Sequence, residues 1–209
     1  MGDNAQEEGV RKVIVAEFVS LDGVVTDPDG AEGTEGGGWA FRHGPVAIAG
    51  DKFRLGELFD TGALLMGGVT WRKFAAIWPS RTDEFSTLMN RIPKLVVSRS
   101  IAAVDAWSNS ALLRGDLVEE VARRKETQVL VVVGSLSVAR TLMAHDLVDE
   151  YRLLTFPTVV GGGRRLFGDG AAPLHLELEA AERVGPAVLT FYRRPTHSPG
   201  HPGREGGVS

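Results

Sequence analysis

The chain has 209 residues, no cysteine, a formal net charge of -4 and 43% hydrophobic residues. This balance is typical of a globular protein with a single α/β domain, and the lack of cysteine excludes disulfides, cysteine nucleophiles and thiolate metal sites. The weakly acidic balance leaves no large basic surface for a nucleic-acid backbone, so we expect no nucleic-acid partner.

Both ends of the chain are too polar to bury much surface. We therefore expect flexible tails at 1–9 and 195–209, around one domain over 10–194. The N-terminus lacks the apolar core of a signal peptide, and no stretch reaches the length of a membrane-spanning helix. These features predict a soluble, cytoplasmic protein without membrane contact.

Short apolar runs alternate with helical patterns along the domain. Uniformly apolar, β-branched runs, typical of buried parallel strands, lie at Lys12–Phe18, Ala63–Met66, Lys94–Ser98 and Gln128–Val133. Helical patterns lie at Pro45–Asp60, Trp71–Ile77, Asp83–Arg91, Asp116–Lys125 and Leu136–His145. Strands separated by helices in this way predict parallel pairing with right-handed crossovers.

The C-terminal part of the domain has a different pattern. Leu174, Leu176 and Leu178 alternate with polar residues, and the strand-like run VLTFYRR follows after VGPA. This pattern predicts an antiparallel hairpin at the sheet edge. The expected fold class is therefore α/β, with three layers and a mixed, mainly parallel sheet of about eight strands that ends in the hairpin.

Glycines and hydroxyls follow the second predicted strand, in the run ALLMGGVTW. Gly67 and Gly68 would let a ligand approach the backbone, and Thr70 stands where a helix would begin, so the turn could bind a phosphate. The alternative is a tight turn that Thr70 caps, with no ligand.

Two more predicted strands end in similar residues. Gly134 and Ser135 follow one of them, in VVVGSLS, and Ser98 and Arg99 follow the other, in KLVVSRS. Open α/β sheets bind ligands at the carboxyl ends of their strands, so these ends together indicate a dinucleotide site. A guanidinium with hydroxyls suits a phosphate monoester, although each motif alone is also an ordinary turn or a solvated loop.

These motifs resemble a known family. LLMGGVTW resembles the LxMGRxTW signature of dihydrofolate reductases, and VVSRS is similar to their strand end that binds the 2′-phosphate of the cofactor. The run VVGSLSVARTLMAHDLVDEYRLLTFPTVVGGGRRLF, with VSLDGVV near the N-terminus, resembles the branch of that superfamily that contains the reductase domain of riboflavin biosynthesis, the RibD C-terminal domain. The resemblance covers roughly Val13 to Tyr192.

The resemblance implies a dihydrofolate reductase-like fold that binds NADPH. The residues it assigns to the cofactor are Ala16, Gly67, Gly68, Thr70, Ser98, Arg99, Gly134, Ser135, Leu136 and Ser137. Gly68 stands where dihydrofolate reductases usually carry a basic residue that contacts the cofactor phosphate, so Arg99 or Arg72 would have to replace that contact. Ser135 likewise replaces the second glycine of the usual pair.

The acid that would serve the substrate has two candidates, Asp22 in SLDG and Asp51 on the helix predicted before ALLMGG. Asp51 stands at the interval of the substrate-binding carboxylate of bacterial dihydrofolate reductases; the alternatives are an Asp-Gly turn for Asp22 and a solvated helix position for Asp51. Trp39 lies in a glycine-rich stretch, residues 27–44, that looks like a mobile loop over the site. It could stack on a substrate ring or anchor the loop in the core.

The sequence leaves two functional hypotheses of different classes. The first is an NADPH-dependent reductase acting on a small heterocycle of the pterin or pyrimidine-precursor class. The second is a non-catalytic nucleotide-binding or regulatory module on the same fold. The scattered histidines predict no metal site, and the resemblance implies a homodimer.

Overall fold

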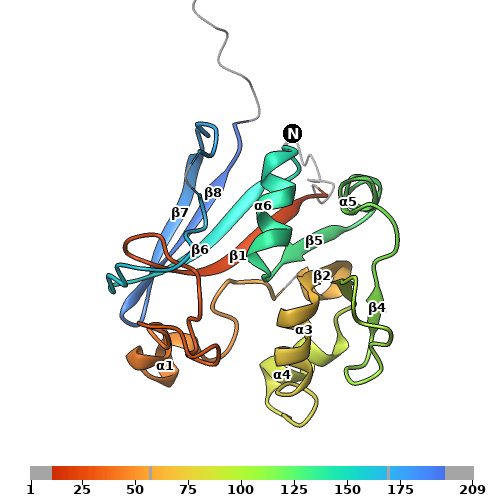
Figure 1. Cartoon of the computed structure of the whole chain (residues 1–209), viewed down its shortest axis with the longest axis horizontal. Helices are drawn as coiled ribbons and strands as arrows, with labels where there is room; N and C mark the ends of the chain where they lie inside the picture. Colours follow the sequence, from red (N-terminus) through yellow and green to blue (C-terminus); the bar gives the residue numbers. More distant parts are fainter. Residues whose placement is uncertain (1–10, 57, 169, 196–209) are drawn as a thin grey trace, which may run out of the picture.

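The computed structural model describes residues 11–56, 58–168 and 170–195, which form one eight-stranded sheet with the order β4-β3-β2-β5-β1-β6-β8-β7 (Figure 1). The strands are β1 Val13–Ser20, β2 Gly62–Gly67, β3 Lys94–Val97, β4 Ser110–Leu112, β5 Val129–Val132, β6 Glu150–Phe156, β7 Glu177–Val184 and β8 Ala187–Arg193. Neighbouring strands from β4 to β6 in this order pair in parallel. The predicted C-terminal hairpin, β7 with β8, adds to β6 in the antiparallel sense.

Helices cover both faces of the sheet and give the predicted three layers. The described helices are η1 Phe41–His43, α1 Pro45–Ile48, α2 Leu58–Thr61, α3 Gly68–Ala75, α4 Glu84–Arg91, α5 Leu117–Lys125 and α6 Leu136–Ala144. Val13 and Val15 of β1 pack in one apolar cluster with residues of α5 and α6. The alternate residues Ile14 and Ala16 pack in a second cluster with residues of α3 and α4. This alternation follows from the two-residue period of a strand.

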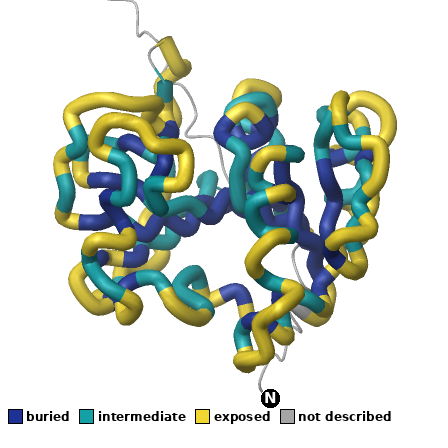
Figure 2. Tube along the Cα trace, turned by 60° about the horizontal axis from the view of Figure 1, so that its bottom comes forward, coloured by how far each residue is buried: buried dark blue, intermediate teal, exposed yellow. Residues whose placement is uncertain are grey.

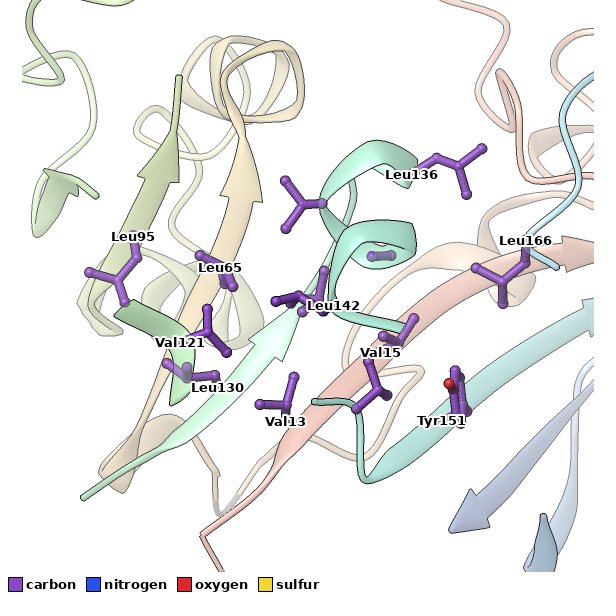
Figure 3. Close-up of a cluster of buried hydrophobic side chains, with 14 of the residues drawn as sticks. Val13, Val15, Leu65, Leu95, Val121, Leu130, Leu136, Leu142, Tyr151 and Leu166 are labelled. Atoms are coloured by element: carbon purple, nitrogen blue, oxygen red, sulfur yellow. The ribbon is translucent and has the colours of Figure 1, made fainter. Parts of the chain in front are cut away.

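The core lies along the central strands, where the backbone is buried while the outer loops are exposed (Figure 2). In the cluster drawn in Figure 3, Leu142 of α6 lies over the sheet near Leu130 and Val15. Burial on both faces explains why β2, β5 and the first half of β1 have uniformly apolar sequences.

The structure differs from the sequence-based expectations in two helical regions. The predicted helix Pro45–Asp60 is wrong, because only Pro45–Ile48 and Leu58–Thr61 are helical. The first helix ends because Ala49 is extended, with a ψ of 148°, and Gly50 follows it with a φ of 76°, so neither residue continues the helix. Asp51 therefore lies in an irregular segment. Helix α3 also begins at Gly68, earlier than predicted, so Thr70 is inside the helix and is not its N-cap.

Lys94 is a charged residue in the core at the start of β3. Its side chain is fully buried, and its ammonium donates to the carbonyls of Asn90 at 2.8 Å and Ser108 at 3.0 Å. It also lies 4.3 Å from the ring centroid of Trp107. Burial lowers the pKa of Lys94 to about 8. These contacts fix the strand that leads to Ser98.

The predicted tail residues 1–9 and 196–209 lie outside the described residues. Within the described ranges, no helix combines the length and the apolar character needed to cross a membrane.

Replacing Leu142 with Ala tests the contribution of α6 to this core. The side chain is fully buried, so the substitution should lower the free energy of unfolding by about 2–5 kcal/mol through reduced burial and a cavity. Urea denaturation measures it. The control Leu21→Ala, at a side chain that is 66% exposed, should change stability by no more than about 0.5 kcal/mol. Equal effects of the two substitutions would contradict the assigned packing.

Candidate functional site

The candidate site is built where three parallel strands end at one level. The register pairs Leu65 of β2 with Val132 of β5, and Gly67 with Val97 of β3. The turns that follow these strands therefore meet at the carboxyl edge of the sheet. This edge adjoins β1, which lies between β5 and β6. The direction of strand addition reverses there, and open α/β sheets bind ligands at such a point.

The turns after β2 and β5 are in direct contact. The amide of Gly67 donates to the carbonyl of Gly134 at 3.3 Å. A Cβ atom placed on Gly67 would lie 2.4 Å from the Oγ of Ser135, closer than any real contact allows. Gly134 itself has a φ of 76° and is joined to Ser135 by a cis peptide bond. Gly67 is therefore required by the packing of the two turns, as well as being suited to ligand approach.

The turns after β2 and β3 also touch. A Cβ atom on Gly68 would lie 2.9 Å from both the Oγ of Ser98 and the Cδ1 of Ile101. The hydroxyl of Ser98 accepts the amides of Ser100, at 3.2 Å, and Ile101, at 3.0 Å, and so holds its own turn in place. A side chain at position 68 would therefore require the side chains of Ser98 and Ile101 to shift.

The two helices that begin at this edge have first turns without side-chain caps. The N-cap residues of α3 and α6 are Gly67 and Ser135, and neither makes a side-chain hydrogen bond to its own helix start. In contrast, Asp83 caps α4 and Asp116 caps α5, both through their carboxylates. The amides at the starts of α3 and α6 thus remain suited to phosphate oxygens, which also favour the positive end of a helix dipole.

Arg99 provides a cation at the same edge. Its side chain is exposed, and it forms no ion pair with the residues that the structure describes. Arg99 follows Ser98 directly, so its guanidinium is able to reach a phosphate held near the Ser98 turn. Ser137 lies in the first turn of α6, and its hydroxyl is 2.9 Å from that of Ser135. The structure thus brings together the predicted cofactor residues of all three turns.

The structure adds Glu17, which our sequence reasoning missed. Glu17 lies on β1. A Cβ atom placed on Gly134 would lie 3.8 Å from the Oε1 of Glu17 and 3.0 Å from the Oγ1 of Thr70. The amide of Gly134 donates to its carboxyl group, but burial dominates and raises the pKa of Glu17 to about 8. The sequence held a signal for Glu17, because Glu17 is the acidic residue in the otherwise apolar run that follows Lys12, KVIVAEF. The neighbouring Ala16 is 3% exposed and contributes a side chain only to the core.

Asp22 lies beyond the end of β1 and holds a turn. Its Oδ1 accepts the hydroxyl of Ser20 at 2.6 Å and the amide of Val160 at 3.1 Å, and its Oδ2 accepts the amide of Gly161 at 2.8 Å. The Ser20 hydroxyl, followed by these amides, lowers the pKa of Asp22 to about 2. Asp22 is thus an ionised anchor between β1 and the segment after β6.

Asp51 does not lie with the turns of the candidate site. Its two carboxylate oxygens each accept one backbone amide, from Leu55 and Gly56, both at 2.8 Å. It borders a cleft of about 450 Å³ together with Lys12, which precedes β1 and so marks the opposite end of that strand. The interval of Asp51 to the glycines after β2 matches that of the family's carboxylate, but the helix predicted around Asp51 does not form.

The glycine-rich segment is organised by a buried carboxylate and by Trp39. Asp27, which is 1% exposed, accepts amides from Glu32 and Thr34, each at 2.9 Å. Trp39 is 1% exposed and donates from its indole to the carbonyl of Thr26 at 2.8 Å. This position corrects the expectation that Trp39 stacks on a substrate ring, because its ring packs in the core and anchors the loop.

A large cleft lies beside the glycine-rich segment. It has a volume of about 670 Å³ and is lined by Thr26, Thr34, Glu35, Gly36, Gly37 and Val160 with Gly161, Gly162 and Gly163. Lys73 of α3 ties this segment to the candidate site, since its ammonium lies 3.1 Å from Glu32 and 3.7 Å from Asp29. The cleft and the turns therefore share one edge of the sheet. No cluster of potential metal ligands occurs among the residues described.

Comparison with known proteins agrees with this geometry. The sequence profile of the RibD C-terminal domain matches residues 11–190. The chain belongs to the RibD C-terminal domain family. A sequence relative, the uncharacterized protein YyaP of Bacillus subtilis (strain 168), is 28% identical over 102 residues, 48% of this chain and 53% of that protein. The match thus spans about half the length of this relative.

Solved structures share the fold of this family member. A putative riboflavin biosynthesis protein from Shewanella sp. PV-4 has a TM-score of 0.67 and 22% identity, with 88% of this chain and 99% of that chain covered. A pyrimidine reductase-like protein from Corynebacterium diphtheriae has a TM-score of 0.59 and 15% identity, with 87% and 91% covered. A deaminase/5-amino-6-(5-phosphoribosylamino)uracil reductase from Thermotoga maritima has a TM-score of 0.59 and 17% identity, with 88% and 56% covered.

A double-mutant cycle tests the contact between the turns after β2 and β5. Gly67→Ala places a methyl group 2.4 Å from the Ser135 hydroxyl oxygen, so it should lower the free energy of unfolding by about 1–3 kcal/mol. The same substitution in a Ser135→Gly background should cost clearly less, because the clashing side chain is gone. Thermal or urea unfolding of the four proteins measures the coupling. A cost that is the same in both backgrounds would contradict the contact.

Proposed function

We propose that this protein is an NADPH-dependent reductase that acts on a small heterocycle of the pterin or pyrimidine-precursor class. The observation that carries the proposal is the meeting of three strand-end turns at which two helix starts lack side-chain caps. Membership of the RibD C-terminal domain family supports it. When bound, NADPH would supply a hydride to the acceptor.

The residues of the three turns fit this cofactor. The starts of α3 and α6, with Thr70, Ser135 and Ser137, would hold the pyrophosphate through amides and hydroxyls. Ser98 and Arg99 would hold the 2′-phosphate, because Arg99 offers an exposed guanidinium beside a hydroxyl. This charge takes the place of the basic residue that position 68 cannot accommodate. We therefore expect the protein to prefer NADPH to NADH.

The acceptor would bind in the cleft between the glycine-rich segment and residues 160–163. Thr26, Thr34 and Glu35 line it beside several glycines, and together these residues offer a carboxylate and backbone amides and carbonyls. Such groups can pair with the ring nitrogens, carbonyls and amino groups of a pterin or an aminouracil. The ion pairs of Lys73 would keep this wall next to the cofactor turns.

A non-catalytic nucleotide-binding module is the second candidate function. One observation favours it, because the acids singled out in the sequence, Asp22 and Asp51, are both occupied by backbone amides. Such a module would bind the nucleotide without oxidising it.

Titration with NADPH and NADH, followed by energy transfer from tryptophan to the nicotinamide, tests the cofactor site. NADPH should bind more tightly than NADH. Ser98→Ala combined with Arg99→Ala should weaken NADPH binding about 10–100-fold and leave NADH binding nearly unchanged, because both substitutions remove groups that bind the 2′-phosphate. Arg183→Ala on β7, which removes an exposed arginine elsewhere, is the matched control.

Oxidation of NADPH at 340 nm with dihydrofolate or 5-amino-6-(5-phosphoribosylamino)uracil then separates the two candidate functions. Turnover supports the reductase, and binding without turnover supports the module. Failure to bind either nucleotide would refute both.

We also propose that the protein is a homodimer that pairs through β7, the outer strand of the sheet. Leu178 on this strand is 58% exposed, and an uncovered edge strand offers unpaired backbone groups. Light scattering should give about twice the chain mass of 22.4 kDa, and Leu178→Lys should give the single mass. A monomeric wild type would refute this arrangement.

A further inference from the structure

The glycine-rich segment beside the cleft is folded around one of its own carboxylates. Asp27 accepts the amides of Glu32 and Thr34 and the hydroxyl of Thr34, each at 2.9 Å. A Cβ atom on Gly37 would lie 2.3 Å from the Oδ2 of Asp27, so the backbone closes tightly around this group. Residues 27–37 are therefore held together as one unit, and its part from Thr34 to Gly37 lines the 670 Å³ cleft.

Two side chains from outside the unit join it to the rest of the described chain through hydrogen bonds or ion pairs. Arg42, which follows the unit in the chain, donates to the carbonyl of Gly37 at 3.1 Å. The ammonium of Lys73, on α3, lies 3.1 Å from Glu32 and 3.7 Å from Asp29. Lys73 is therefore the side chain that joins the unit to a helix of the cofactor turns.

The unit is acidic, and several of its carboxylates surround Lys73. Residues 27–35, DPDGAEGTE, contain four acids and no basic residue. Besides its two ion pairs, Lys73 acts on Asp27. Burial opposes ionisation of Asp27, but the hydrogen bonds that it accepts and the charge of Lys73 outweigh burial and lower its pKa below the usual value. The charge of Lys73 thus offsets part of the negative charge of the unit.

The helix that carries Lys73 also carries part of the candidate phosphate site. Helix α3 begins at Gly68 with a first turn that no side chain caps, and Lys73 lies about 7.5 Å further along the helix axis. The pyrophosphate and the 2′-phosphate of NADPH would place several negative charges near this helix start. The acidic unit and the cofactor would then repel each other, and the charge of Lys73 would offset that repulsion.

We propose that Lys73 is a positioning residue that keeps this acidic unit in place as a wall of the acceptor cleft while the anionic cofactor is bound. The role rests on the proposed reductase function. Lys73 is not among the residues that line the described cleft, so it acts on the acceptor through Asp29 and Glu32. Without its charge, the phosphates of the cofactor would displace the unit outward and open this side of the cleft.

Distances within the protein test this role without turnover. The chain has no cysteine, so Ala31→Cys in the unit and Glu119→Cys on α5, both at exposed positions, can carry two spin labels. With Lys73 present, the distance between the labels should keep one narrow distribution with and without NADPH. In Lys73→Met the distribution should shift and broaden when NADPH is added, whereas Lys73→Arg, which keeps the charge, should preserve it. A narrow, unshifted distribution in Lys73→Met with NADPH bound would overturn the proposal.

Cofactor affinity provides a second reading. Lys73→Met should bind NADPH about three- to fivefold more weakly at low salt, because the acids of the unit then repel the phosphates without an offsetting cation. Adding Asp29→Asn and Glu32→Gln to Lys73→Met should restore the affinity, and about 0.5 M salt should remove the difference from the wild type. A loss that persists after both acids are replaced would show that Lys73 binds the cofactor itself, and would contradict its role as a positioning residue.

Turnover tests whether the wall matters to the acceptor. Lys73→Met should raise the KM of the acceptor about fivefold and leave kcat nearly unchanged, because a displaced wall weakens binding and does not alter hydride transfer. An unchanged KM would overturn this role while the reductase function stands. A wild type that binds NADPH without oxidising it would refute the reductase, and the spin-label distances would still decide whether Lys73 holds the wall.

Discussion

The structure depends on the close packing of three turns at the carboxyl edge of the sheet. Strands β2, β3 and β5 end at one level because their parallel register is fixed by core side chains on both faces. The turns then approach so closely that a Cβ atom on Gly67 would clash with the side chain of Ser135, and one on Gly68 with the side chains of Ser98 and Ile101. The same approach brings the starts of α3 and α6 side by side, which is what makes the edge a candidate phosphate site.

The fold could be predicted because its physical causes are local in the sequence. Strands buried on both faces must be apolar throughout, as VLVV of β5 is, and Asp116 marks the start of α5 because its carboxylate caps that helix. The helix expected over Pro45–Asp60 does not form as one element, because Ala49 and Gly50 leave the helical conformation. Strand β6 was harder to recognise, since Glu150 and Arg152 pair with each other while buried and interrupt its apolar pattern.

The sequence pointed to the glycines and hydroxyls that meet in the candidate site, and pointed much less well to its acids. Glycines and hydroxyls at strand ends have a position that sequence alone defines, whereas the role of a carboxylate depends on its partners. Asp22, Asp27 and Asp51 all organise backbone amides, which no spacing rule distinguishes from catalysis. Glu17 is the acidic side chain that the fold instead brings to the cofactor turns, because β1 happens to end its apolar run beside Gly134.

The contact between Gly68 and Ser98 has a consequence for how such proteins diverge. A basic side chain at position 68 requires the Ser98 turn to move away, and a turn like that of Ser98 excludes a side chain at position 68. Residues 68 and 98 are therefore not independent. Homologues of this chain are expected to carry matched residues at these two positions, so that the two strand ends change together and not by single substitutions.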